Sequence, residues 1–140
     1  MTRAMWHNYE IRVRYQETDQ MGVVYHANYL TWLEIGRTEM IRELGIPYER
    51  LEAQGLLLPV LEADLKFRQP ARYDDRVTVY TRLESLTPMR LHFAYEVKRD
   101  DDLLVAGATR HVWVNRSWKP VRLDREAPAV YALLTEAGSR

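Results

Sequence analysis

Residues 28–44 read NYLTWLEIGRTEMIREL, and this stretch decides the fold of the chain. It has the spacing of a long helix, and the segment Gly45-Ile46-Pro47 that follows supplies a helix stop. The apolar residues in the stretch are Tyr29, Leu30, Trp32, Leu33, Ile35, Met40, Ile41 and Leu44. They form a set wider than one stripe, so we expect the helix to be buried over much of its circumference.

Most of the remaining chain has the pattern of β-strands. Residues 9–15 alternate between apolar and charged side chains, which is typical of a half-buried strand. The same reasoning predicts strands at 57–67, 76–84, 90–98 and 103–115, with a hairpin turn at 100–102. Short helices are expected at 48–54 and 128–137. In the last strand, the small residues of the segment 106–108 (AGA) would allow another backbone or helix to come close.

The order of these elements indicates the architecture. One strand precedes the long helix, and four consecutive antiparallel strands follow it. A helix that is apolar on several sides needs a sheet that curves around it. We therefore predict an α+β hotdog fold, in which a curved five-stranded antiparallel sheet wraps around one long central helix. The 140 residues are expected to form a single domain, 1–140.

Composition excludes several classes of function. The formal net charge is zero, so no global basic field suggests nucleic acid as a partner. No apolar run is long enough to span a membrane, and the amino-terminal residues lack the apolar core of a secretory signal. The chain has no cysteine, which excludes disulfides and a cysteine nucleophile. These features predict a cytoplasmic protein.

Common catalytic motifs are also missing from the sequence. None of the three serines lies in a G-x-S-x-G elbow, and there is no H-E-x-x-H, P-loop or G-x-G-x-x-G motif. The four histidines have no metal-ligand spacing, so we expect no metal site and no cofactor. A hydrolase built on this chain must work with a carboxylate and backbone dipoles.

The segment just before the long helix, YQETDQMGVVYHANY at 15–29, could supply both. A helix start offers unpaired N–H groups and a positive dipole end. Asp19 lies in the polar turn that leads to it, and His26 lies at its entrance. Considered alone, an aspartate in such a turn is most often a turn former.

The same segment resembles the signature of the 4-hydroxybenzoyl-CoA thioesterase family, and is most similar to its Tol–Pal-associated acyl-CoA thioesterase branch. The match continues through EIGRTE at 34–39, PARYDD at 70–75 and KPV at 119–121, so it spans residues from about 8 to 125. The D-x-x-G-V-V-Y-H-x-N-Y core is specific, whereas the later stretches are weak by themselves.

The resemblance implies an acyl-CoA thioesterase that hydrolyses acyl- or aroyl-CoA. Asp19 would be the catalytic carboxylate, either attacking the thioester or activating a water as general base. The backbone N–H of His26 would be the oxyanion donor, and Gly22 would let the loop approach the ligand. Substrate contacts are expected from Tyr25 and Trp32, and CoA phosphate contacts from Arg68, Arg90 and Lys119.

Further expectations concern partners and the remaining polar residues. CoA is expected as part of the substrate, with acyl carrier protein as an alternative carrier of the acyl group. The resemblance also implies a dimer or tetramer, in which each cleft is shared between subunits. Asn28 and Tyr29 are expected to be architectural, Glu39 to pair with Arg42, and His92 and His111 to be ordinary sheet residues.

Two rival functions remain at this point. A hotdog dehydratase or hydratase would use a histidine–carboxylate pair, which His26 and Glu34 could mimic. A non-catalytic acyl-binding subunit of a larger assembly would need the cleft but no chemistry.

Overall fold

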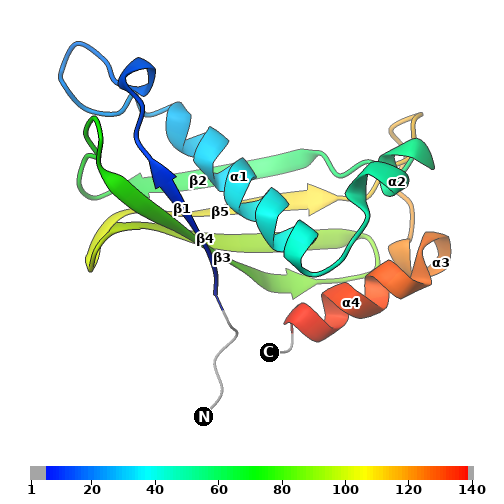
Figure 1. Ribbon diagram of the computed structural model, residues 1–140. Helices are drawn as coiled ribbons and strands as arrows, with labels where there is room; N and C mark the ends of the chain where they lie inside the picture. Colours follow the sequence, from blue (N-terminus) through cyan, green and yellow to red (C-terminus); the bar gives the residue numbers. More distant parts are fainter. Residues whose placement is uncertain (1–5, 139–140) are drawn as a thin grey trace.

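The computed structural model describes residues 6–138, which form one antiparallel sheet, one long helix across it and smaller helices at its end (Figure 1). The strands are β1 (His7–Arg12), β2 (Val60–Phe67), β3 (Arg76–Leu86), β4 (Arg90–Arg99) and β5 (Asp102–Val112). The helices are η1 (Tyr15–Glu17), α1 (Asn28–Glu43), α2 (Tyr48–Ala53), α3 (Leu123–Glu126) and α4 (Pro128–Gly138).

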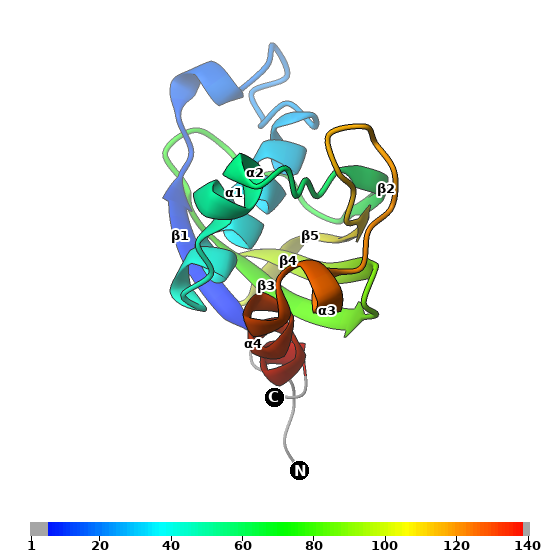
Figure 2. The ribbon, with the colours of Figure 1, turned by 90° about the vertical axis from the view of Figure 1, so that its right-hand side faces the viewer.

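The sheet has the strand order β1-β3-β4-β5-β2, and every neighbouring pair is antiparallel. The prediction of four consecutive strands holds for β3, β4 and β5, but β2 lies at the opposite edge, beside β5. Figure 2 shows β1 and β2 on opposite sides of α1. The connection from β2 to β3 therefore crosses β5 and β4, and the sheet curves beneath the helix.

Helix α1 packs closely against β3 at Gly36. A Cβ atom at this position would lie 2.6 Å from Thr81 Oγ1 and 2.7 Å from Val79 Cγ1. The buried residues of α1 are Tyr29, Trp32, Leu33, Gly36, Met40 and Ile41. The prediction of burial on several sides is wrong for Leu30, which is 46% exposed, because the buried residues of α1 recur at spacings of three and four along one face and Leu30 lies outside that stripe.

Some predicted boundaries also shift. β1 ends at Arg12, since the Val13 N–H donates to the Asp75 carbonyl in a loop and the chain then turns into η1. Tyr15 is 77% exposed and does not continue the buried face. Proline at position 59 delays β2 until Val60, and the short helix α3 was not predicted. The expected close approach at Gly107 is confirmed, because a Cβ atom there would lie 2.9 Å from the Asp64 carbonyl oxygen.

None of the helices within residues 6–138 is long and apolar enough to cross a membrane.

Candidate active site

A buried glutamate anchors the loop that precedes α1. Glu17 is 6% exposed, and its Oε2 accepts a hydrogen bond of 2.8 Å from the indole N–H of Trp32 in the second turn of α1. Its Oε1 accepts from the Arg14 N–H at 2.8 Å. Its backbone carbonyl accepts from the Tyr25 N–H at 2.9 Å and from the Asn28 side-chain amide at 2.8 Å. Both ends of the loop are thus tied to the start of the helix.

The loop holds Asp19 in a tight turn. The Asp19 N–H donates to the Val23 carbonyl at 2.9 Å, and the Gly22 N–H donates to the Asp19 carbonyl at 3.0 Å. Asp19 Oδ1 accepts from the Met21 N–H at 2.8 Å. Among residues 6–138, no hydrogen bond engages Oδ2. One carboxylate oxygen is therefore fixed by the turn and the other is available for chemistry.

The turn requires a glycine for its backbone conformation. Gly22 has a φ of 79°, which side chains of L-residues rarely adopt. No atom lies within 4 Å of where its Cβ would be, so the space there is open. Clearance for a ligand at Gly22 stays a prediction.

Two backbone donors stand free at the entrance of α1. The helix begins at Asn28 with Ala27 as its N-cap, so His26 immediately precedes the cap. The His26 carbonyl accepts from the Tyr29 N–H at 3.2 Å, which places this residue in the first turn of hydrogen bonds. In the described part of the chain, the N–H groups of His26 and Ala27 have no hydrogen-bond acceptor. They lie at the positive end of the helix dipole and suit an anionic oxygen.

Asp19 and His26 line the same cavity, which has a volume of about 270 Å³. Apolar side chains form most of its wall; the full lining is Asp19, Met21, Val23, Val24, His26, Tyr29, Phe67, Arg68, Gln69 and Pro70. The ring of Phe67 lies 6.3 Å from that of His26 and 5.6 Å from that of Tyr29, measured between centroids. The cavity thus joins a carboxylate, free N–H donors and an apolar surface.

The far wall of the cavity is tied to the same helix start. The Ala71 N–H donates to the Tyr29 hydroxyl at 3.1 Å, and the Val24 N–H donates to the Ala71 carbonyl at 2.8 Å. Arg99 donates to Asp75 at 2.8 Å and to the Pro70 carbonyl at 3.2 Å. These bonds fix the segment that follows β2 opposite Asp19. The architectural role expected for Tyr29 agrees with this placement.

Comparison with known proteins places the chain in a family. Residues 13–130 match the sequence profile of the thioesterase-like superfamily. The chain belongs to this superfamily. It is 37% identical over 121 residues to a Bacillus subtilis protein provisionally named acyl-CoA thioesterase YneP, which covers 85% of this chain and 88% of that protein. It is 33% identical over 95 residues to the acyl-CoA thioester hydrolase YbgC of Escherichia coli O6:H1, covering 68% and 71% respectively.

A solved structure agrees over nearly the whole chain. The DHNA-CoA thioesterase from Staphylococcus aureus superposes with a TM-score of 0.92 at 33% identity, covering 96% of this chain and 92% of that one. The predicted family and hotdog fold are therefore confirmed.

The other residues predicted for the thioesterase site are distributed unevenly. Arg68 lines the Asp19 cavity, and the exposed Tyr25 contacts the His26 ring with centroids 4.6 Å apart. Trp32 is fully buried beneath the loop, so its position is in the core and not on the cavity wall. Arg90 alternates with the buried Leu91 and lies with the side chains on the sheet face away from α1. Lys119 lies in an exposed turn beyond β5.

Sequence reasoning missed Glu17, which holds the loop together. Its local partner Arg14, three residues earlier, pairs with it at 3.6 Å, but that spacing gave no sign that the carboxylate is buried. The partner that explains its burial, Trp32, lies 15 residues further along the chain. Only the folded chain brings the two together.

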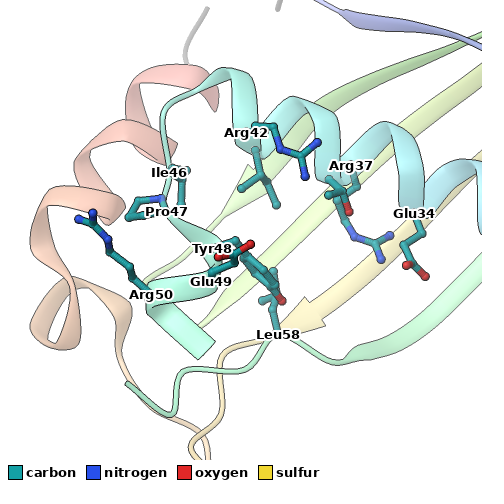
Figure 3. Close-up of a pocket in the computed structure, with 11 residues that line it drawn as sticks. Glu34, Arg37, Arg42, Ile46, Pro47, Tyr48, Glu49, Arg50 and Leu58 are labelled. Carbon is teal, nitrogen blue, oxygen red and sulfur yellow. The ribbon is translucent and has the colours of Figure 1, made fainter. Parts of the chain in front are cut away.

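A second cavity, of about 400 Å³, lies beside the carboxyl-terminal half of α1 (Figure 3). Its lining comprises Glu34, Arg37, Thr38, Ile41, Arg42, Ile46, Pro47, Tyr48, Glu49, Arg50 and Leu58. Figure 3 shows Glu34 and Arg37 projecting from α1 toward the same side. The predicted pair of Glu39 and Arg42 is confirmed, with 2.5 Å between the carboxylate and the guanidinium.

A buried polar chain leads from Arg37 into the sheet. Arg37 Nη1 donates to the Tyr95 hydroxyl at 3.1 Å, and the Tyr95 hydroxyl lies 2.7 Å from Thr109 Oγ1. Thr109 Oγ1 lies 2.8 Å from Nε2 of His111. Burial, reinforced by the nearby Arg37 charge, lowers the pKa of His111 from 6.5 to about 4. His111 is therefore neutral at pH 7. Its Nδ1 faces the Leu58 carbonyl at 3.5 Å and carries the ring proton there, so Nε2 accepts a hydrogen bond from the Thr109 hydroxyl.

Proposed function

We propose that this protein is an acyl-CoA thioesterase that hydrolyses acyl- or aroyl-CoA to a free acid and CoA. The observation that carries the proposal is one apolar cavity lined by both Asp19 and His26, at a helix start whose N–H groups have no acceptor in the described chain. Relatives that match most of the chain carry the names of acyl-CoA thioesterases, which supports the same activity.

The proposed chemistry follows from this arrangement. The thioester carbonyl oxygen is placed at the N–H groups of His26 and Ala27, which stabilise the negative charge that develops there. The free oxygen Oδ2 of Asp19 either attacks the carbonyl carbon to form a mixed anhydride, or removes a proton from the water that attacks it. The carbon–sulfur bond breaks as the tetrahedral intermediate collapses, and the CoA thiolate takes up a proton as it leaves. On the first route this collapse gives the mixed anhydride, which water then hydrolyses to release the acid and restore the Asp19 carboxylate.

The test is thiol release from a panel of acyl- and aroyl-CoAs. We expect Asp19→Asn to lower kcat/KM by about 100-fold or more while the protein keeps its fold. Asp101→Asn is the matched control, because it makes the same chemical change in the exposed turn between β4 and β5. Equal activity of Asp19→Asn and the control would show that Asp19 is only a turn residue.

The two rival functions fit the site less well. A dehydratase would need His26 and Glu34 together, but within one subunit these residues line different cavities. Hydration of a crotonyl thioester without thiol release would nevertheless favour that rival. Capture of partner proteins by Asp19→Asn, with no turnover by the parent protein, would favour the binding subunit.

We also propose that two copies pair through β2. This strand is at the sheet edge, so one row of its backbone groups is free to bind another strand. On the face toward α1 it carries Val60, Ala63, Leu65 and Phe67; Val60 is 48% exposed and Phe67 54% exposed. Apolar side chains on an open edge are what a second sheet would cover.

Charge selects the register of this pairing. On the opposite face β2 carries Glu62, Asp64 and Lys66. If a two-fold axis passes through Leu65, each Asp64 faces the partner's Lys66. If the axis instead passes through Asp64 or Lys66, two Asp64 or two Lys66 side chains face each other, which is destabilising.

A cysteine cross-link tests this register. The chain has no cysteine, so Leu65→Cys introduces a single thiol that would face its own copy across the axis. We expect rapid oxidation to a covalent dimer, and much slower oxidation for Ala63→Cys, which would face the partner's Phe67. A monomer in solution, or equal rates for the two variants, would contradict the pairing.

Three finer expectations accompany the proposal. The tetramer implied by the resemblance would be a pair of these dimers, which light scattering would distinguish from a dimer. Acyl carrier protein thioesters belong in the same assay as an alternative substrate. The proposed compartment is the cytoplasm, to be tested by fractionation.

A further inference from the structure

The loop that carries Asp19 is a short hairpin with two arms. At its base the Glu17 carbonyl accepts from the Tyr25 N–H at 2.9 Å, and toward its tip the Asp19 N–H donates to the Val23 carbonyl at 2.9 Å. The first arm carries Asp19, whereas the second arm leads through His26 into α1. The position of the Asp19 carboxylate relative to the free N–H groups at the helix start therefore depends on how the first arm is held against α1.

The Glu17 side chain connects the first arm directly to α1. Its Oε2 accepts from the indole N–H of Trp32 at 2.8 Å, and the exposed fractions of the two residues are 6% and 0%. The indole packs edge to face on the ring of Tyr29, with centroids 5.0 Å apart, so it is itself held in the core. The connection is thus fixed at its α1 end.

Both oxygens of the Glu17 carboxylate are used by N–H donors. Oε1 accepts from the Arg14 N–H at 2.8 Å, while Oε2 accepts from Trp32. A glutamine would offer one acceptor oxygen to these two donors, and its amide nitrogen would face the other one. Among residues 6–138 the only cation within 4.0 Å of this carboxylate is Arg14, whose Nε is 3.6 Å away and whose side chain is 66% exposed. A buried charge with such a partner costs free energy, and what it provides is a fixed geometry.

We propose that Glu17 is a positioning residue for thioester hydrolysis: its bond to Trp32 sets the distance between the Asp19 carboxylate and the free N–H groups at the start of α1. The inference rests on the proposed thioesterase function. Both routes to the products need these groups at one carbonyl, with the carboxylate or its water at the carbon and the N–H groups at the oxygen. A displacement of about 1 Å can lower the rate by about 100-fold. The apolar cavity wall that binds the acyl group does not include Glu17, so its loss should slow the chemical step and not binding.

Steady-state kinetics of thiol release give the first test. Glu17→Gln should lower kcat by about tenfold to 100-fold, with KM within about twofold of the wild-type value. Trp32→Phe removes the indole donor but keeps the bond of Glu17 to Arg14, and it should lower kcat in the same direction. Val130→Ala is the control for stability, because it removes buried apolar atoms from α4, away from the loop. It should retain the wild-type kcat although its urea midpoint falls.

Combining the two substitutions gives the second test. In Glu17→Gln the side-chain amide faces one N–H donor too many, and Trp32→Phe removes one of the two donors. The kcat of the double variant should therefore exceed, by about tenfold or more, the value obtained by multiplying the two single losses. The indole N–H resonance of Trp32, identified by its absence from Trp32→Phe, should shift in Glu17→Gln.

The outcomes separate this inference from the proposed function. Positioning by Glu17 is overturned, and the thioesterase stands, if Glu17→Gln keeps its kcat, changes only KM, or loses no more kcat than Val130→Ala. Multiplication of the two single losses in the double variant would overturn it as well. If Glu17→Gln does not fold, Trp32→Phe decides by the same kinetic criteria. Absence of thiol release by the wild type from every substrate, or full activity of Asp19→Asn, would overturn both proposals.

Discussion

Protonation of His111 should destabilise the fold as the pH falls from 7 to 5. The side chain is 1% exposed, and its pKa is lowered from 6.5 to about 4, first by burial and then by the Arg37 charge. The unfolded chain therefore binds a proton at a higher pH than the folded chain does. Stability from the neutral histidine is complete above pH 6.5 and is lost progressively as the pH falls toward 4.

The two pKa values set the size of the effect. The full shift of 6.5 to about 4 corresponds to roughly 3 kcal/mol, of which about 2 kcal/mol is lost between pH 7 and pH 5. This interval lies above the ordinary pKa values of most carboxyl groups, so the contribution of His111 should be visible there.

Urea unfolding followed by tryptophan fluorescence measures the loss. Wild type and His111→Gln are compared at pH 7 and pH 5 and at one protein concentration, because a dimer's apparent stability depends on concentration. His111→Gln should be less stable than the wild type at pH 7, since it disturbs the bond to Thr109. Between pH 7 and pH 5, the free energy of unfolding of His111→Gln should fall by about 2 kcal/mol less than that of the wild type. Equal losses in the two proteins would show that His111 is not held neutral by the fold.

Two further predictions concern packing and the wall of the Asp19 cavity. Gly36→Ala should destabilise the protein by about 1–3 kcal/mol, because the new methyl group would lie 2.6 Å from Thr81 Oγ1. Urea unfolding measures this loss. An unchanged unfolding midpoint would mean that α1 can move away from β3 without penalty. Tyr29→Phe should cost about 1–3 kcal/mol, because the Ala71 N–H loses its acceptor, and hydrogen exchange at Ala71 should accelerate. Exchange as slow as in the wild type would show that this N–H does not depend on Tyr29.

The sequence by itself determined the elements and the local part of the site. The alternation of residues in β3, β4 and β5 and the apolar set of α1 follow from side-chain periodicity, which depends only on neighbouring positions. Asp19, Gly22 and His26 lie within eight residues of one another, so one loop before one helix holds all three, and Asp19 and His26 line the same cavity. Local chemistry of this kind can be read directly from the chain.

The tertiary structure alone decided which distant residues meet. Periodicity shows which face of a strand is buried but not which strand lies beside it, so it could not place β2 next to β5. Likewise, the Glu17–Trp32 bond and the contact of Arg37 with Tyr95 join positions 15 and 58 residues apart. Buried polar groups must find partners, but the sequence does not specify which ones, because the packing of α1 on the curved sheet sets those distances.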